Sequence, residues 1–306
     1  MYDTVNLWQN GFNISGGNPF DILPYLSDVT EYQSKHGYSC SGNVFDYTVN
    51  VFERGISLKG SLCKSFFGDN LQTLKRSVIK QAIEKLNDHL HIDLSEAKVT
   101  RFDVSTVIPT KRPPADYYAY LGNKPYFQRE QWKESLYYSN HQRQINFYDK
   151  SKEAKAKFMD IPDIWKNSNL FRYELRYLRN INSQLKADVT ASTLYDKDFY
   201  SNVIQNWYNE FKTIQKLKNN SFMIDGIKTP KEAQEALFSY LLQGAGQNLV
   251  TEFLSELKAN NTFPDRKYYT RLKADLNKML VSKNGNKSDL MQELETAIFN
   301  IARYAR

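Results

Sequence analysis

The sequence predicts an α+β fold, in which a sheet-based domain with covering helices is followed by an all-helical domain. Up to about residue 180, short segments alternate apolar and polar residues, which is the side-chain period of a β-strand. Beyond about residue 195, apolar residues recur every three or four positions, which is the period of an α-helix. We therefore expect an α+β domain over residues 1–183 and a helical domain over residues 184–306.

Strands are expected where β-branched and aromatic residues alternate with polar ones. Such runs cover residues 2–8, 44–52, 55–63, 98–108, 135–139, 143–150 and 170–178. One helix is expected over 71–90, because leucine, valine and alanine recur at helical spacing after the turn at 68–70. A shorter helix is expected over 113–122, where Pro114 opens the first turn and Gly122 ends the last.

The helical domain begins with an apolar stripe that runs from Phe199 to Ile214. Thr229, Pro230 and Glu232 form a capping box with proline at the first helical position, which opens the next helix. Further apolar stripes cover residues 249–257, 269–280 and 290–301. Basic and aromatic residues in segments such as RKYYTRLKADLNK favour DNA binding by this domain, and an oligomerisation role, as in a homodimer, is the alternative.

Composition favours a partner that carries negative charge. The chain has a net charge of +7, and residues 101–180 contain 15 basic and 9 acidic residues. Most of the excess therefore lies in one stretch. Cys40 and Cys63 are the two cysteines, too few for a disulfide framework and not at metal-site spacing. No segment approaches the about 18 apolar residues of a membrane span, so we expect a cytoplasmic protein.

Three of the expected strands carry reactive side chains on their polar side. Alternation places Asp103 in the stretch VTRFDVSTV, Tyr148 in RQINFYDK and Glu174 in LFRYELRYL opposite to the apolar residues of each run. If these strands are neighbours, two carboxylates and a phenol converge. Basic residues surround them in the sequence, namely Arg101, Arg143, Lys150, Arg172 and Arg176.

This combination is suited to phosphoryl transfer. Asp103 and Glu174 would supply hard oxygen ligands, which Mg²⁺ and Mn²⁺ prefer. Tyr148 would be the nucleophile, with Lys150 helping its phenol to ionise. The structural alternative is a solvated strand face with weak cross-strand pairs. Other tyrosines compete for the role of nucleophile, namely Tyr117, Tyr118, Tyr120, Tyr137 and Tyr138.

The order TRFDVS, YYS, QINFYDKSKE and RYELRY over residues 99–178 resembles the signature of rolling-circle replication initiators. Two segments nearer the start of the chain, YDTVNLW and ISLKGSLCKSFFGDN, are most similar to the phage and plasmid replication proteins named after gene II and gene X. These proteins are related to the staphylococcal-type plasmid initiators. The resemblance implies that Tyr148 is the nicking nucleophile and that Asp103 and Glu174 are the acidic residues of the site. The chain departs from plasmid members at Val107, where these often have a second aspartate.

A protein of this kind would nick one DNA strand at a specific origin, keep the 5′ end as a phosphotyrosine and leave a 3′-OH primer. Its expected partners are double- and single-stranded origin DNA, a host helicase and a single-strand-binding protein, with no membrane. The residues expected to contact DNA are Arg101, His141, Arg143, Arg172 and Arg176. The rival function is a non-enzymatic DNA-binding protein for copy control or single-strand binding.

A second candidate metal site is the sequence His89, Leu90, His91, which matches the two-histidine motif of another class of tyrosine nickases. Both histidines would have to lie on one strand face to bind a metal. The apolar spacing instead places His89 in the last turn of the helix over 71–90, where a histidine favours the helix dipole.

Overall fold

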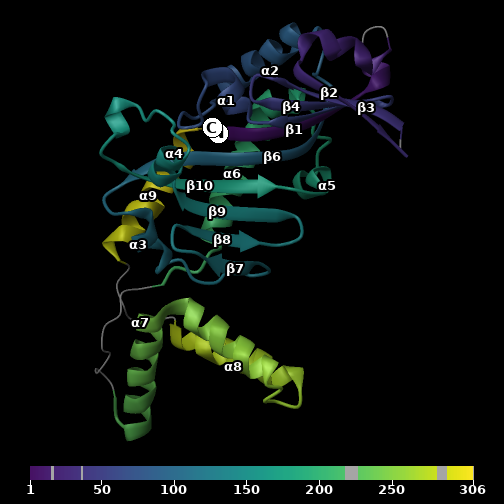
Figure 1. Cartoon of the computed structure of the whole chain (residues 1–306). Coiled ribbons are helices and arrows are strands. Elements are labelled where there is room, and N and C mark those ends of the chain that lie inside the picture. Colours follow the sequence, from purple (N-terminus) through teal and green to yellow (C-terminus); the bar gives the residue numbers. More distant parts are fainter. Residues whose placement is uncertain (15–16, 36, 218–226, 281–287, 306) are drawn as a thin grey trace.

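The computed structural model of the chain describes residues 1–14, 17–35, 37–217, 227–280 and 288–305. In these residues ten strands form one antiparallel sheet with the order β2-β3-β4-β5-β1-β6-β10-β9-β8-β7 (Figure 1). The strands are β1 (Tyr2–Asn10), β2 (Ser27–Ser34), β3 (Gly37–Val44), β4 (Tyr47–Phe52), β5 (Gly55–Gly60), β6 (Lys98–Thr110), β7 (Gln128–Gln131), β8 (Ser135–Ser139), β9 (Arg143–Asp149) and β10 (Asn169–Tyr177).

Helices follow and interrupt the strands. They are α1 (Leu62–Phe67), α2 (Arg76–Leu90), α3 (Pro114–Tyr118), α4 (Lys150–Ala156), α5 (Ile181–Leu185), α6 (Lys197–Lys212), α7 (Pro230–Ala259), α8 (Arg266–Leu280) and α9 (Asp289–Tyr304). Short 3₁₀ turns are η1 (Gly11–Asn13), η2 (Pro19–Tyr25), η3 (Asp163–Trp165) and η4 (Ser192–Tyr195). The large antiparallel sheet with helices at the C-terminal end confirms the α+β class.

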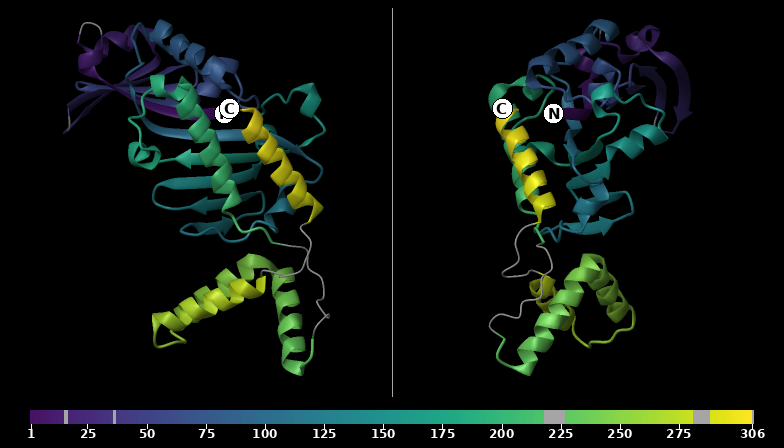
Figure 2. Two further views of the ribbon diagram at one scale, coloured as in Figure 1. Left: turned by 180° about the vertical axis from the view of Figure 1, so that it is seen from behind. Right: turned by 90° about the vertical axis from the view of Figure 1, so that its left-hand side faces the viewer.

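One face of the sheet is covered by helices. α6 and α9 lie across the strands β6 to β9, as the view from behind shows (Figure 2), and α2 covers the N-terminal strands. Tyr173 of β10 stacks on Trp207 of α6 with ring centroids 4.5 Å apart. Ile298 of α9 belongs to the same buried cluster. This core therefore continues past residue 183, because α6 and α9 bury their apolar faces on the sheet rather than on each other alone.

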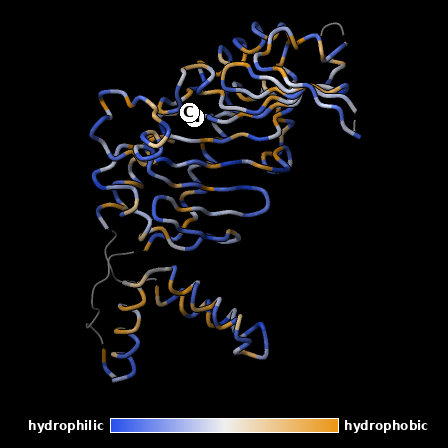
Figure 3. The backbone as a smooth tube through the Cα atoms, in the orientation of Figure 1, coloured by the Kyte–Doolittle hydropathy of each residue, from blue (hydrophilic) through white to orange (hydrophobic). Residues whose placement is uncertain are grey.

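The remaining two helices form a hairpin apart from this core. α7 and α8 pack on each other through a small cluster of Leu242, Val250, Leu254, Leu276 and Leu280. α7 carries many hydrophobic residues along its length (Figure 3), and some of them, such as Leu241 and Phe238, are about half exposed. The hairpin lies between α6 and α9 in the sequence, so it is an insertion between two helices of the main core.

Several elements differ from the sequence expectations for identifiable reasons. β2 is exposed along its whole length at the sheet edge, so no apolar alternation marks it. The expected strand over 55–63 ends at Gly60, because Ser61 caps the N-terminus of α1 through a hydrogen bond from the Lys64 amide. The stripes near 230 and over 249–257 are one helix, and its capping box at Thr229 is present.

Candidate functional site

The three strands with reactive side chains are neighbours, in the order β6, β10, β9. Glu174 of β10 lies opposite Asn146 of β9 on one side and Ser105 of β6 on the other. Tyr148 lies opposite Arg172, two residues further along the same strand pair. The three strands are therefore neighbours, as a shared site requires. Strand alternation places these polar side chains on the face opposite to the one that α6 and α9 cover.

Both carboxylates are buried and held by arginines. Asp103 accepts from Arg101 twice, with Nε to Oδ1 at 3.0 Å and Nη2 to Oδ2 at 2.7 Å. Glu174 accepts from Arg176 Nη2 at 2.9 Å through Oε2. The Arg176 Nε atom lies 3.7 Å from Asp103 Oδ2, so this guanidinium bridges the two acids. The side chains of Arg101 and Arg176 remain 31% and 29% exposed, which leaves part of each guanidinium open to solvent.

Burial changes the acidity of the first carboxyl group. The pKa of Asp103 is raised to about 6, because desolvation outweighs the hydrogen bonds from Arg101 that favour the carboxylate. The nearby charge of Glu174 raises this pKa further. A buried carboxyl group with a raised pKa and cationic neighbours is common at active sites.

A third side-chain oxygen, that of Asn146, lies beside Glu174. Asn146 donates its Nδ2 to Glu174 Oε2 at 3.2 Å, while its buried Oδ1 accepts no hydrogen bond from any residue that the structure describes. Two carboxylates and one unpaired amide oxygen form a donor set that fits Mg²⁺ or Mn²⁺, which retain waters as further ligands. Among the described residues, no group of three or more His, Cys, Asp or Glu side chains is arranged to hold a metal ion.

Tyr148 lies at the edge of this cluster, half-buried. Desolvation raises the pKa of its phenol well above the usual value, and the charge of Arg172 opposes this shift only in part. The phenol is therefore neutral in the free protein. Within the described part of the chain, its hydroxyl has no hydrogen-bond partner. The side chain borders a surface groove whose lining includes Ser135, Tyr137, Asn146, Tyr148, Lys152 and Arg176.

Most of the competing tyrosines have structural roles. Tyr138 donates its hydroxyl to the carbonyl oxygens of Leu121 and Gly122, at 3.0 and 2.7 Å. Tyr118 donates to the Glu134 carbonyl, Tyr117 donates to the Glu293 carboxylate, and Tyr120 packs against the core. Tyr137 is different, because it lies opposite Asn146 and borders the same groove as Tyr148.

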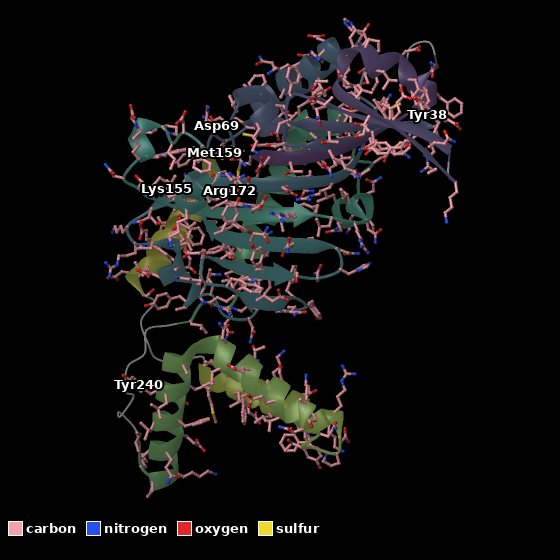
Figure 4. The ribbon with its side chains drawn as sticks, viewed as in Figure 1. Tyr38, Asp69, Lys155, Met159, Arg172 and Tyr240 are labelled. Atoms are coloured by element: carbon pink, nitrogen blue, oxygen red, sulfur yellow. The ribbon has the colours of Figure 1, made fainter. Side chains whose placement is uncertain are left out.

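Buried polar residues on the same sheet face hold the strands next to the site. Arg172 is 1% exposed and forms an ion pair with Asp3 of β1, and it also donates to the Ser105 hydroxyl and the Asn70 carbonyl, both at 2.6 Å. Figure 4 labels Arg172 on β10 and Asp69 in the neighbouring loop. Asp3 and Asn70 could not be predicted as part of the site from the sequence, since only the topology places β1 beside β6.

Lys150 belongs to these buried polar residues as well. Its ammonium group is fully buried and donates to Asn70 Oδ1 at 2.7 Å and to Glu153 Oε2 at 2.6 Å. Burial, followed by the charge of Arg172, lowers the pKa of Lys150. Its partners are therefore Asn70 and Glu153, and the charge that most favours ionisation of the Tyr148 phenol is that of Arg172.

Comparison with known families identifies the chain. Residues 12–208 match the family model Phage_CRI, which describes the N-terminal part of a phage replication-associated protein. The chain belongs to this family. The match contains β6, β9 and β10 and so all of the residues of the candidate site except Asp3. Among curated protein sequences, no match to this chain was found. A relation to the staphylococcal-type initiators stays an expectation.

Two of the expected DNA contacts of this replication-associated protein lie elsewhere. Arg143 is on the opposite face of β9 from Tyr148 and forms an ion pair with Glu210 of α6. His141 lies in the turn before β9 and contacts Arg179 at 3.3 Å. His141 precedes Tyr148 by seven positions, a separation on the order of 20 Å in an extended chain. The position of Arg143 corrects the expectation that it surrounds the nucleophile, and the expected contact of His141 with DNA stays a prediction.

The two-histidine motif does not form a strand site in this replication-associated protein. His89 is in the last turn of α2, as the apolar spacing predicted, and its Nε2 lies 3.1 Å from the Tyr25 carbonyl oxygen. His91 caps the helix in the left-handed conformation and packs on the Tyr25 ring, with centroids 4.4 Å apart. In the described part of the chain, no helix is both long and apolar enough to cross a membrane.

Proposed function

We propose that this replication-associated protein initiates rolling-circle replication by nicking one DNA strand at an origin through Tyr148. The observation that carries the proposal is the placement of Tyr148, whose unbonded hydroxyl lies on the open sheet face beside the buried pair Asp103 and Glu174. Membership of a family of replication-associated proteins supports DNA as the substrate.

The proposed reaction is a transesterification. The Tyr148 oxygen attacks the scissile phosphorus, a bond forms between them, and the bond from phosphorus to the 3′ oxygen breaks. The phenolic proton leaves Tyr148, and the departing 3′ oxygen ends as a hydroxyl, so no water or external energy source is consumed. The product is a 5′-phosphotyrosine with a free 3′-OH, which a polymerase can extend. Strand displacement from that primer would require a host helicase and a single-strand-binding protein.

The acidic residues are proposed to hold a divalent cation. Asp103, Glu174 and the unpaired Oδ1 of Asn146 fit Mg²⁺ or Mn²⁺ by their oxygen chemistry. A bound cation would polarise the scissile phosphate and neutralise charge that develops on it. It would compete with Arg101 and Arg176 for the same carboxylates, so both arginines would be released towards the DNA phosphates when the cation binds.

The basic residues divide into two roles in this account. Arg101 and Arg176 are partly exposed beside the acids, and we assign them to the phosphates around the scissile bond. Arg172 and Lys150 are buried and fully engaged, so we assign them to positioning. Arg172 lies opposite Tyr148 and favours its phenolate, which makes its charge part of the activation of the nucleophile.

The experiment is a nicking assay on supercoiled plasmid that carries the origin, with Mn²⁺ present. Wild-type protein should convert supercoiled DNA to open circles, and Asp103→Ala and Glu174→Ala should each lose this activity because a single remaining carboxylate holds a cation poorly. The double variant His89→Ala with His91→Ala is the control and should nick normally. A dead histidine variant together with active acidic variants would contradict the proposed site.

A second candidate function is non-enzymatic DNA binding, for copy control or single-strand binding. It is favoured by the ion pairs that already satisfy both carboxylates in the cluster. In this case the groove would bind DNA without a metal, and the assay above would leave the plasmid supercoiled under all conditions.

A further inference from the structure

The two halves of the sheet follow the same path. In the first half β1 pairs with β5, and β4, β3 and β2 continue outward to one edge. In the second half β6 pairs with β10, and β9, β8 and β7 continue outward to the other edge. β1 and β6 are antiparallel neighbours, so the topology places an approximate two-fold axis between them. The second half contains the candidate site, which raises the question of what the first half contains.

The pairing register repeats together with the path. Asn146 of β9 lies opposite Glu174 of β10, and Asn50 of β4 lies opposite Ser57 of β5. Both halves therefore have an asparagine at this position of the fourth strand. The partner on the fifth strand is an acid in the second half and an uncharged serine in the first.

The position of the proposed nucleophile is also matched. Tyr148 lies opposite Arg172, and Phe52 lies opposite Gly55 at the corresponding step of the register. Phe52 therefore occupies the place of Tyr148. It retains the aromatic ring but has no hydroxyl, so no phosphotyrosine can form there.

The second acid is replaced as well. Leu7 and Val104 occupy matching positions of the two central strands, because each pairs with a leucine of the fifth strand in the same register. Asn6 precedes Leu7 as Asp103 precedes Val104, so an amide stands where the second half has a carboxylate. The first half is thus a copy of the site from which the nucleophile and both acids are absent.

Cationic and aromatic groups are present in this copy. Lys59 occupies the place of Arg176, since Lys59 lies opposite Thr48 as Arg176 lies opposite Gln144. The Arg54 guanidinium lies 5.5 Å from the centroid of the Trp8 ring. The rings of Trp8 and Phe52 are 6.1 Å apart, so the two rings make one apolar platform on the sheet.

The platform is open to solvent, and the acidic side chain of Glu53 lies at its edge, in the turn between β4 and β5. Trp8, Asn50 and Phe52 are partly exposed and Lys59 is exposed, whereas Asp3 is buried in its pair with Arg172. Among the accessible side chains on this face of β1, β3, β4 and β5, whose residues are all described, none is acidic. A surface pocket opens at the end of β4, and it is lined by Tyr38, Phe52, Glu53 and Arg54.

We propose that this half of the sheet is a second, non-catalytic site that binds single-stranded DNA. Bases would stack on Trp8 and Phe52, and phosphates would lie against Lys59 and Arg54, a combination that tolerates any sequence. This inference rests on the proposed function in one respect, the path of the DNA strand, which would run from the nick at Tyr148 to this platform. Duplex DNA fits less well, because its bases are not free to stack on protein rings.

The two sites lie on one continuous surface. Trp8 lies opposite Lys98 of β6, and Asp103 follows Lys98 by five residues on the same strand. This separation is about 15 Å along the strand. Lys98 and Arg101 lie between the two sites with their side chains accessible, so cations continue from the platform to the acids.

The test is the affinity of the full chain for a labelled single-stranded oligonucleotide of about 15 nucleotides, measured by fluorescence anisotropy at fixed salt. The Tyr148→Phe background prevents covalent capture. Trp8→Ala and Lys59→Glu should each weaken binding by about tenfold, because each removes one stacking or phosphate contact. Trp8→Phe should restore most of the affinity lost in Trp8→Ala. Lys80→Glu is the matched control, since Lys80 is an exposed lysine of α2 on the covered side of the sheet, and it should bind as the parent does.

The outcomes separate this inference from the proposed function. Unchanged affinity in both Trp8→Ala and Lys59→Glu would overturn the second site, whether or not the protein nicks DNA. Weakened affinity in both variants would support the second site even if the wild-type protein failed to nick in the plasmid assay, a failure that would overturn only the proposed reaction. Equal losses in Lys80→Glu would show a general charge effect and would also overturn the inference.

Discussion

At the scale of single residues, Asp103 combines burial, two arginine partners and a pKa near neutrality. We predict that Asp103→Asn makes the protein more stable at about pH 7.5, by an amount on the order of 3 kcal/mol. The reason is that burial raises the pKa of the folded protein to about 6 from the ordinary value of 3.8, so ionisation is less favourable in the folded than in the unfolded state.

Because the pKa of Asp103 is raised on folding, the stability gain of Asp103→Asn depends on pH. Above about pH 6 the carboxyl group is ionised in both states and the cost is fully present. As the pH falls towards 3.8, the folded protein retains its proton while the unfolded chain gains one, and the difference between wild type and Asp103→Asn should disappear. Denaturant unfolding of the wild type and of Asp103→Asn at several pH values measures this difference in the free energy of unfolding. A variant that is less stable than wild type at neutral pH would show that the arginine pairs outweigh burial.

How much of the site the sequence could predict also depends on single residues. Alternation alone placed Tyr148, Asp103 and Glu174 on polar strand faces, and the register confirms that these faces coincide. Alternation also assigns Arg143 to the face of Ile145, so its position away from Tyr148 was predictable from the same pattern, whereas its partner Glu210 was not. Asp3 was not available, because its role depends on a strand order that joins residues far apart in the chain.

At the scale of elements, the α7–α8 hairpin is the best candidate for recognition of the origin duplex. α8 carries Arg266, Lys267, Arg271, Lys273 and Lys278 on its exposed surface, while Leu276 and Leu280 face α7. The hairpin contacts the sheet domain through both helices. Arg129 donates to Asn248 of α7 at 2.8 Å, and Asn123 donates to Asn277 of α8 at 2.9 Å. It is therefore attached to the side of the sheet that carries β7.

We predict that a protein without residues 230–280 folds and cuts single-stranded origin DNA but loses its preference for origin duplex. It should fold because α6 and α9, which cover the sheet, are retained. Competition binding between origin and unrelated duplex measures the preference. The variant Lys267→Glu with Arg271→Glu tests the same surface with the hairpin in place. Undiminished preference in both proteins would leave the hairpin with a packing or dimerisation role.

Element boundaries were predictable where local signals are strong and not where packing decides. The capping box at Thr229 and the helix end at His89 are local, and both are found as expected. The division at residue 183 was drawn from a change of period, and the period changes there because strands end and helices begin. It could not reveal that α6 returns to the sheet, since an apolar stripe does not identify its partner.

At the scale of the whole molecule, one face of the ten-stranded sheet packs against helices, and the other carries the residues of the candidate site. The helices α2, α6 and α9 bury the apolar face, and the opposite face carries the polar side chains, although Leu71, Ile161 and Trp165 cover the part of it around Val107 and Leu170. The acids and Tyr148 lie on one half of that face, and the aromatic and cationic platform lies on the other. The alternation of the strands predicted such a division for each strand alone, but the repeat of the two halves is visible only in the pairing register.

The central claim is that Tyr148 becomes joined to DNA, and mapping of the covalent adduct tests it most directly. Wild-type protein would be incubated with labelled origin oligonucleotide and a divalent cation, separated on a denaturing gel, digested and mapped by mass spectrometry. Tyr137→Phe is the matched control, because Tyr137 borders the same groove. The account predicts an adduct on the peptide that contains Tyr148, its loss in Tyr148→Phe and its persistence in Tyr137→Phe. An adduct on Tyr137, or nicking without any adduct, would contradict the account.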